Sequence, residues 1–141
     1  MSFDLSVVNG DLAIKNGDLA TVTGQDKLVQ DIEKICLTTV GCNIFQPWYG
    51  SYVSKTLIGQ CLDAGITETV AKTQLQNSLE NLKKLQQFQL NSGLQEVVPA
   101  EHIAAIQQVN IQRDSKDPRI FRVVIKVLNR MFRSTVANFT A

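Results

Sequence analysis

The sequence has few of the residues from which metal sites and disulfides are built: one histidine and three cysteines in 141 residues. A single histidine excludes sites with several histidine ligands. Cys36, Cys42 and Cys61 form no CxxC pair, which argues against a disulfide framework or a zinc site. We therefore predict reduced thiols, no metal and no cofactor. There is also no window of about 18 apolar residues and no basic segment before an apolar one, so we expect neither a membrane span nor a signal peptide.

A strong charge of either sign is also missing, because the formal net charge is +1 and 19% of the residues are charged. Binding to nucleic acid would therefore depend on a local basic patch. The candidates are the basic residues of the last third, namely Arg113, Lys116, Arg119, Arg122, Lys126, Arg130 and Arg133. Apolar residues interrupt this set along predicted strands, so we expect no nucleic-acid partner.

The common catalytic signatures are absent, since no GxSxG, HExxH, P-loop or GxGxxG string occurs. His102 lies just before a predicted strand, where we expect a surface or capping residue. None of the thirteen acidic residues has an apolar sequence context that would raise its pKa. Asp31, Glu80 and Glu96 have the pattern of solvated side chains. We predict that the protein is not an enzyme.

One string that is present twice, NGDL at residues 9–12 and 16–19, is typical of two-residue type I′ hairpin turns. Two such turns predict three short antiparallel strands that form a β-meander. The expected cross-strand pairs are Val7–Leu12, Leu5–Ile14, Ile14–Leu19 and Leu12–Thr21. These six side chains would share one face, with Ser6, Ala13 and Ala20 on the other. A ribbon this small is only marginally stable alone, so we expect its apolar face to pack against the rest of the domain or against a partner.

Three helices are predicted after this ribbon. The first begins at a capping box, Thr23 to Asp26, and continues to about Val40 with a stripe of Leu28, Ile32, Ile35 and Cys36. The second runs from Ser51 to about Leu62 and ends at the break Asp63-Ala64-Gly65. The third runs from Thr67 to about Leu90, and its apolar stripe consists of Ala71, Leu75, Leu79, Leu82 and Leu85.

An aromatic segment, GCNIFQPWYGS at residues 41–51, lies between the first two predicted helices. It contains Phe45, Pro47, Trp48 and Tyr49. So aromatic a loop favours a packed elbow that seats the first helix on the core. The alternative is an exposed aromatic anchor for another protein.

From Ile103 onward the pattern changes to strands. Val109 and Ile111 alternate with polar residues, and Phe121, Val123, Ile125 and Val127 form an apolar face. A last strand from Met131 to Phe139 has weak alternation, which is typical of a sheet edge or of a strand that pairs with another chain. We predict a single α+β domain over residues 1–141: an N-terminal β-meander (1–23), then three helices (24–92) packed on a small antiparallel C-terminal sheet (100–141).

The order of these features resembles the contractile-tail sheath initiator family. The likeness rests on NGDL, on GQDKLVQDIEKICLT, on G-x-N-I-F-x-P-x-Y-G-S, on the long helix and on a late acidic-Pro-Arg string before an apolar strand. It covers about residues 4–139. Members are structural baseplate wedge proteins of contractile-tailed phages, with relatives in contractile injection and type VI secretion machines.

The resemblance implies a virion protein of the tail baseplate, present in the host cytoplasm during assembly, that initiates sheath assembly by strand augmentation. Its implied partners are the tail sheath protein and baseplate wedge proteins, with the tail tube or hub as a further neighbour and several copies around the tail axis. No membrane and no nucleic acid are involved. Two alternatives stay open: a lysozyme-like peptidoglycan hydrolase, a label that the family has carried, and a type VI secretion baseplate component.

The same resemblance suggests two sets of site residues. Asp117, Pro118 and Arg119 match the family's Glu-Pro-Arg string, which implies docking on the wedge core, although Asp is one methylene shorter than Glu. Arg119 beside Asp117 would offer a guanidinium fork to a carboxylate. The expected sheath contact runs from about Ile120 to Phe139 through Phe121, Arg122, Val123, Val124, Ile125, Lys126, Val127, Arg133, Val136 and Phe139.

Overall fold

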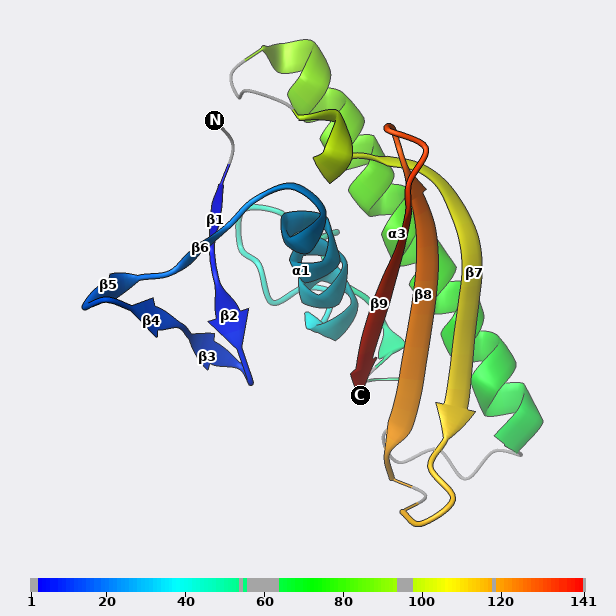
Figure 1. Cartoon of the computed structure of the whole chain (residues 1–141). Coiled ribbons are helices and arrows are strands. Elements are labelled where there is room, and N and C mark those ends of the chain that lie inside the picture. Colours follow the sequence, from blue (N-terminus) through cyan, green and yellow to red (C-terminus); the bar gives the residue numbers. More distant parts are fainter. Residues whose placement is uncertain (1–2, 54, 56–63, 94–97, 118, 141) are drawn as a thin grey trace.

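The computed structural model describes residues 3–53, 55, 64–93, 98–117 and 119–140. The elements within them, in chain order, are β1 (Asp4–Leu5), β2 (Val7–Val8), β3 (Asp11–Leu12), β4 (Ile14–Lys15), β5 (Asp18–Leu19), β6 (Thr21–Val22), α1 (Gly24–Leu37), α3 (Ala64–Ser92), the 3-10 helix η1 (Pro99–Glu101), β7 (Ile103–Arg113), β8 (Phe121–Asn129) and β9 (Ser134–Thr140). Figure 1 shows α1 between the small N-terminal strands and the sheet β7-β8-β9, with α3 running behind that sheet.

The six N-terminal strands form a closed three-armed unit, here called the trefoil (residues 4–22). Its arms are the pairs β1–β6, β2–β3 and β4–β5. The arms meet where Ser6, Ala13 and Ala20 form a cycle of backbone hydrogen bonds. The N–H of Ser6 donates to Ala20, that of Ala20 to Ala13 and that of Ala13 to Ser6, with N···O distances of 2.8, 2.9 and 2.9 Å. These three small residues are seven positions apart, so the trefoil follows a seven-residue repeat.

The predicted turns are confirmed, but the predicted meander is wrong. Asn9, Gly10, Asn16 and Gly17 all have positive φ, from 53° to 83°, as type I′ turns require. Of the expected pairs, Val7–Leu12 and Ile14–Leu19 form, whereas Leu5–Ile14 and Leu12–Thr21 do not. Leu5 pairs with Thr21 instead. The reason is that the chain changes arms at Ser6, Ala13 and Ala20, so the last strand closes on the first rather than extending a ribbon.

One buried glutamine fixes the trefoil to α1. The Gln30 amide accepts a hydrogen bond from the Val7 N–H at 2.9 Å and donates to the Leu5 carbonyl at 2.8 Å. It also donates to the Asp4 carboxylate, which is paired with Lys34. The side chain of Gln30 thus satisfies backbone groups on both sides of Ser6, much as a neighbouring strand would.

Helix α1 begins where it was predicted, but a different residue caps it. Thr23 is the N-cap residue, yet its side chain makes no capping hydrogen bond. The Gly24 N–H donates to Glu101 at 3.2 Å, and the second oxygen of that carboxylate pairs with Lys27 at 3.2 Å. A carboxylate at this position satisfies a free helical N–H and lies at the positive end of the helix. The helix ends at Leu37 rather than near Val40.

Helix α3 starts earlier than predicted, at Ala64. The expected helix break at Asp63-Ala64-Gly65 is therefore wrong for Ala64 and Gly65, the two of these residues that the structure describes. It ends at Ser92, and Gly93 follows with φ of 64°, as is usual for a residue that terminates a helix. The side chains of both predicted stripes are at most 4% exposed, except Leu85, which is half-buried. They pack with the inner face of the sheet in one hydrophobic core.

The sheet is antiparallel, with β8 between β7 and β9. Its inner face includes the predicted apolar row Phe121, Val123, Ile125 and Val127, all at most 4% exposed. A turn follows β8 at Asn129, where Oδ1 of Asn129 accepts the N–H groups of Met131 and Arg133 at 3.0 and 2.9 Å. Because this turn occupies 130–133, the last strand starts at Ser134 rather than at Met131.

The predicted architecture, an N-terminal meander and three helices on one C-terminal sheet, is therefore wrong. The described residues form two α-helices and nine strands in four small sheets. Most of the expected second helix, Ser51 to about Leu62, lies outside the described residues. Sequence periodicity predicted the helical stripes because they are local, whereas closure of the trefoil joins residues as distant as Asp4 and Val22.

Candidate functional site

The two edges of the C-terminal sheet differ in how they are protected. Strand β7 contains two register shifts against β8, one between Ile103 and Ala105 and one between Ile106 and Gln108. Strand β9 pairs with β8 in regular register over seven residues and carries no proline and no charged side chain. Among the described residues, the β9 backbone hydrogen-bonds only with β8. Bulges, charges and prolines are common protections against edge pairing. Strand β9 has none of these three and is here called the unprotected edge, although α1 contacts this strand.

The residues expected to contact sheath fall into two groups in the structure. Phe121, Val123, Ile125 and Val127 belong to the core. Strand β8 is paired on both sides, so its backbone is already used. The exposed members are Arg122, Val124, Lys126, Arg133 and Val136, and Phe139 is half-buried against the core. The available groups are therefore the β9 edge and the outer face, where Val124 and Val136 are 40% and 46% exposed.

The loop between β7 and β8 holds the residues expected to dock on a wedge. Its ends are joined by a hydrogen bond from the Asp114 N–H to the Ile120 carbonyl at 2.8 Å. The Asp117 carboxylate accepts the backbone N–H of Arg119 at 2.9 Å. Within the described residues the Arg119 guanidinium makes no ion pair, and Arg119 is exposed. Pro118 lies outside those residues. This loop and the Asn129 turn lie at opposite ends of the sheet (Figure 1).

The aromatic segment is only in part the packed elbow that was expected. Tyr49 packs against the core, which agrees with that prediction. Ile44 and Phe45 are 88% and 93% exposed, and Pro47 is exposed as well. An intact elbow would have buried these side chains. The exposed part of the segment fits the alternative, an aromatic anchor for another protein.

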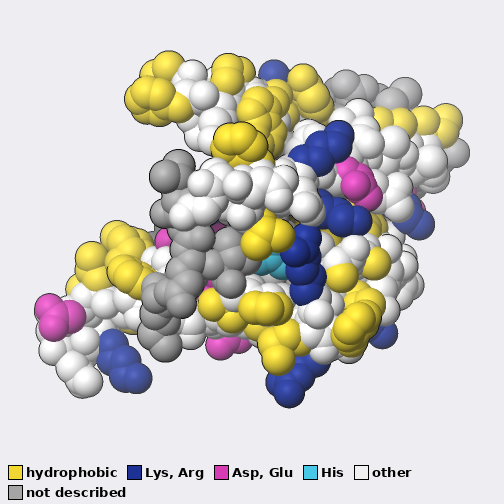
Figure 2. All heavy atoms as spheres, turned by 90° about the horizontal axis from the view of Figure 1, so that it is seen from above, with side chains coloured by type: hydrophobic (Ala, Val, Ile, Leu, Met, Phe, Trp, Pro, Cys, Tyr) yellow, Lys and Arg dark blue, Asp and Glu magenta, His cyan; other side chains and the backbone are white. Residues whose placement is uncertain are grey.

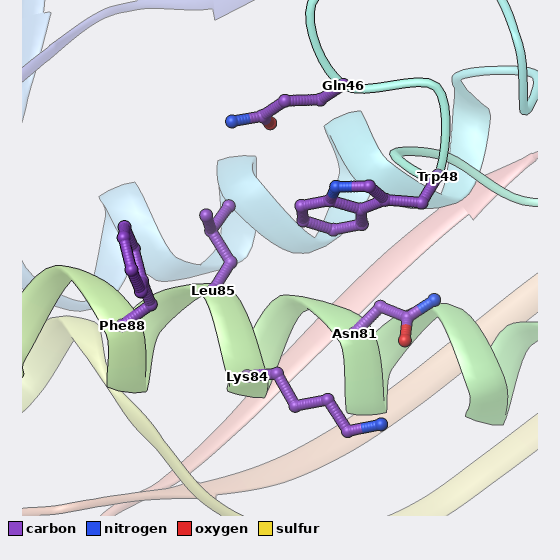
Figure 3. Close-up of a pocket in the computed structure, with 6 residues that line it drawn as sticks. All are labelled: Gln46, Trp48, Asn81, Lys84, Leu85 and Phe88. Carbon is purple, nitrogen blue, oxygen red and sulfur yellow. The ribbon is translucent and has the colours of Figure 1, made fainter.

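Trp48 forms an open pocket with α3. The pocket has a volume of about 380 Å³ and is lined by Gln46, Trp48, Asn81, Lys84, Leu85 and Phe88. Figure 3 shows the Trp48 ring above α3, with Leu85 and Phe88 rising from the helix on the same side and Lys84 pointing away from them. Phe88 is 69% exposed. The pocket is thus an apolar recess beside the exposed aromatic loop.

His102 is buried rather than at the surface, and it is the C-cap residue of η1, which agrees with the capping alternative. It is 4% exposed, its carbonyl accepts the Arg130 N–H at 3.1 Å, and within the described residues its Nδ1 has no hydrogen-bond partner. Burial and the positive charge of Arg130 lower the pKa of His102. The backbone of His102 joins η1 to the Asn129 turn, because its N–H donates to the Pro99 carbonyl and its carbonyl accepts the Arg130 N–H.

Asp31 was expected to be solvated, whereas in the structure it is half-buried. Burial raises its pKa from the ordinary value of 3.8 to about 6, although the ammonium groups of Lys27 and Lys34 act in the opposite direction. The carboxylates of Asp4 and Glu101 add to the increase. Burial likewise raises the pKa of the Cys36 thiol to about 12, so this cysteine stays protonated and unreactive.

Three buried polar side chains with structural roles were not found from the sequence: Gln30, Gln86 and Glu101. Gln86 joins η1 to β7, because its amide donates to the Glu101 carbonyl and accepts from the Ile103 N–H, both at 2.9 Å. One signal was present. Gln86 lies four residues after Leu82, so it continues the apolar stripe of α3 where Leu85 leaves it.

In the part of the chain that the structure describes, no group of three or more His, Cys, Asp or Glu residues is placed to hold a metal ion. Neither described α-helix combines the length and apolar character that a membrane crossing requires. Comparison of the sequence with protein-family models and with curated proteins found no match.

Proposed function

We propose that this protein is a non-enzymatic structural component of a contractile phage tail baseplate that initiates sheath assembly by strand augmentation. The observation that carries the proposal is the unprotected β9 edge. Its seven residues hold their outward N–H and C=O groups in one regular row. A row of this kind is the template to which a strand of another chain adds. The resemblance to the sheath initiator family implies that the added strand comes from the first ring of sheath subunits.

The outer face beside this edge would give the pairing its specificity. Cross-strand rows place Val136 opposite Lys126 and Asn138 opposite Val124. An added strand would extend both rows, so its side chains would meet Val136 and Asn138 directly. Backbone hydrogen bonds supply affinity in such complexes and side-chain rows select the partner.

The wedge contact belongs to the loop at the other end of the sheet. Asp117 holds the loop backbone through the Arg119 N–H, which leaves the Arg119 guanidinium to bind a carboxylate of a wedge protein. The tail tube or hub would be a further neighbour. In this proposal the chain belongs to the baseplate of the virion, in several copies around the tail, without nucleic acid or membrane as partners.

Two lysines added to the β9 edge test the proposal. We expect Val136→Lys with Asn138→Lys to reduce the fraction of baseplates that carry sheath at least tenfold, because edge lysines oppose strand addition. Both residues are exposed, so the fold should persist. The readout is electron microscopy of purified baseplates mixed with sheath protein.

The matched control is Gln108→Lys with Asn110→Lys, which adds the same charge in the same two rows at the β7 edge. The control should support normal sheath. Normal sheath on the β9 variant, or an equal loss in both variants, would contradict augmentation at β9. Deleting Met131–Ala141 is a less specific test, because it also removes Ala137 from the core.

A further inference from the structure

The turn between β8 and β9 presents two apolar side chains to solvent. This turn, residues 130–133, is here called the tip. Met131 is 49% exposed and Phe132 is 84% exposed, and the arginines on either side of them, Arg130 and Arg133, are exposed as well. The tip lies at the upper end of the sheet in Figure 1, and Figure 2, which looks onto that end, shows Lys and Arg side chains beside hydrophobic ones.

One buried residue, Asn129, holds the backbone of the tip. Its side-chain oxygen accepts the N–H groups of Met131 and Arg133. Its carbonyl accepts the N–H of Phe132, and its own N–H donates to the Arg133 carbonyl, both at 3.0 Å. Asn129 itself is fully buried. Four hydrogen bonds to a buried residue therefore fix the conformation of the tip through its backbone.

Phe132 occupies a backbone conformation that favours glycine. Its φ is 60°, and short hairpin loops usually have glycine at such a left-handed position. Among the described residues, the other non-glycine residues with positive φ are Asn9 and Asn16, and asparagine tolerates this region better than an aromatic residue does. Phe132 therefore costs stability relative to glycine, and its exposed ring gains little from packing. Strain of this kind is typical of functional sites, so the ring is expected to act outside the single chain.

The tip also carries positive charge that the surrounding described residues do not neutralise. Among these residues, the Arg133 guanidinium makes no hydrogen bond or ion pair, and Arg130 donates to the neutral Gln87 amide at 2.9 Å. Glu101, in the 3-10 helix before β7, is 4% exposed and paired with Lys27. From residue 119 to residue 140 the sequence has no acidic residue, and its basic residues are Arg119, Arg122, Lys126, Arg130 and Arg133.

We propose that the tip is an anchor for a second protein, which receives the Phe132 ring in an apolar recess and places carboxylates around it. The carboxylates pair with Arg130 and Arg133 on either side of the ring. Phenylalanine, methionine and arginine are enriched in protein interfaces. The tip leads directly into β9, so a strand that adds to this edge begins or ends beside it. The inference thus rests on the proposed function, and it assigns this recess to the sheath subunit that supplies the strand.

A nucleic acid fits the tip and the sheet less well, although arginine also binds phosphate. Sheets that bind single strands stack the bases on aromatic side chains of the exposed face. The aromatic residues of the three sheet strands are Phe121 and Phe139, and both pack in or against the core. The neighbouring β9 edge offers backbone groups, which pair with a polypeptide.

Phe132→Gly separates the anchor from the fold. Glycine adopts a φ of 60° without strain, so we expect little change in the melting temperature. The fraction of baseplates that carry sheath should fall at least tenfold, as counted by electron microscopy of purified baseplates mixed with sheath protein. The matched control is Asn16→Gly, which places glycine at a turn residue with φ of 53° in the trefoil. This control should support normal sheath.

Arg133→Glu tests the charge of the partner. We expect at least a tenfold loss of sheathed baseplates, because a carboxylate at this position repels the carboxylates of the recess. Lys72→Glu is the matched control, since Lys72 is exposed on α3, and it should support normal sheath. Initiation by the wild type should also weaken as sodium chloride is added, because salt screens exposed ion pairs.

The pattern over the variants distinguishes this inference from the proposed function. Normal sheath on both Phe132→Gly and Arg133→Glu, with loss in the double lysine variant of β9, overturns the anchor and leaves strand augmentation in place. Loss in the tip variants with normal sheath on the β9 variant supports the anchor and contradicts augmentation. Normal sheath on Arg133→Glu alone overturns the acidic recess. Binding of the wild-type chain to single-stranded DNA that Arg133→Glu abolishes would assign the arginines to phosphate and overturn the proposal as well.

Discussion

The trefoil and the C-terminal sheet differ in which groups they leave available to a partner, side chains in the trefoil and backbone groups in the sheet. In the trefoil the backbone is closed, since three arms and the Ser6–Ala13–Ala20 cycle use the strand hydrogen bonds. Its aliphatic side chains are exposed, namely Leu5, Val7, Leu12, Ile14 and Leu19. In the sheet the inner face is closed by α1 and α3, while the backbone of β9 is open at the edge. A partner of the trefoil must therefore bring apolar side chains, whereas a partner of the sheet must bring a strand.

The same difference determines what stabilises each region. The sheet depends on buried side chains, so its stability is distributed over the core. The trefoil has no core of its own and depends on turn geometry and on Gln30 and Lys34. A unit of this kind is expected to open locally at a lower free energy than the sheet.

Two isoleucines compare the regions most directly. Ile125 is fully buried in β8, and Ile14 is 73% exposed in the trefoil. We expect Ile125→Ala to lower the free energy of unfolding by about 2–5 kcal/mol, since it removes buried methyl groups and leaves a cavity. Ile14→Ala should change it by less than about 0.5 kcal/mol, the usual range for exposed sites. Urea denaturation at a protein concentration where the chain is monomeric gives both values. Equal losses would show that the trefoil is packed as tightly as the sheet.

The second largest effect concerns Asp31, on the helix between the two regions. Its pKa is raised by burial and further by Asp4 of the trefoil and by Glu101 next to the sheet. The folded chain therefore holds this proton more tightly than the unfolded chain. The resulting stabilisation is complete below the ordinary pKa of 3.8 and is lost as pH rises through about 6. At pH 7 the charged form costs the folded state on the order of 3 kcal/mol.

We accordingly expect Asp31→Asn to stabilise the protein by about 2–3 kcal/mol at pH 7, with a gain that falls to near zero by pH 4. Thermal unfolding of the variant and the wild type across this range measures the difference. Asp26→Asn is the control, because Asp26 lies on the same helix and is exposed. A stabilisation by Asp31→Asn that does not change with pH would contradict a carboxyl whose pKa is raised by partial burial.

The elements that could be predicted from the sequence are those determined by neighbours in the chain. The Asn-Gly turns, the stripes of α1 and α3 and the apolar row of β8 all follow from local patterns. The closure of the trefoil was missed, although Leu19-Ala20-Thr21-Val22-Thr23-Gly24 continues the seven-residue pattern of the two NGDL copies. In the third copy, the residue that corresponds to Gly10 and Gly17 is Gly24, which is the first residue of α1. No hairpin turn therefore marks the third copy in the sequence.

The buried polar residues could not be predicted, because their partners are distant in the sequence. Glu101 caps a helix that starts 77 residues earlier, and Gln30 bonds to strands more than 20 residues away. A glutamine or glutamate that meets such a partner has the same local pattern as a solvated one. For the candidate site, the terminal position of β9 in the sequence indicated a sheet edge. The register shifts of β7, which distinguish the two edges, are seen only in the strand pairing of the structure.

Two glycines give the smallest effects and the sharpest contrast, because the same substitution should have opposite signs. Gly17 lies in a trefoil turn with φ of +83°, Gly65 lies in α3, and a Cβ on either meets no atom within 4 Å. Gly17→Ala should cost about 1 kcal/mol, because alanine is strained at positive φ. Gly65→Ala should gain about 0.5–1 kcal/mol, because alanine favours the helix.

The readout differs between the two glycine variants. In Gly17→Ala we expect faster amide hydrogen exchange in β4 and β5 with little change in the global melting temperature, because the trefoil opens locally. In Gly65→Ala we expect a higher melting temperature and unchanged exchange in the trefoil. If Gly17→Ala lowered the melting temperature as much as Gly65→Ala raised it, the trefoil would unfold together with the core, and the division between a backbone-closed unit and a side-chain-closed unit would not hold.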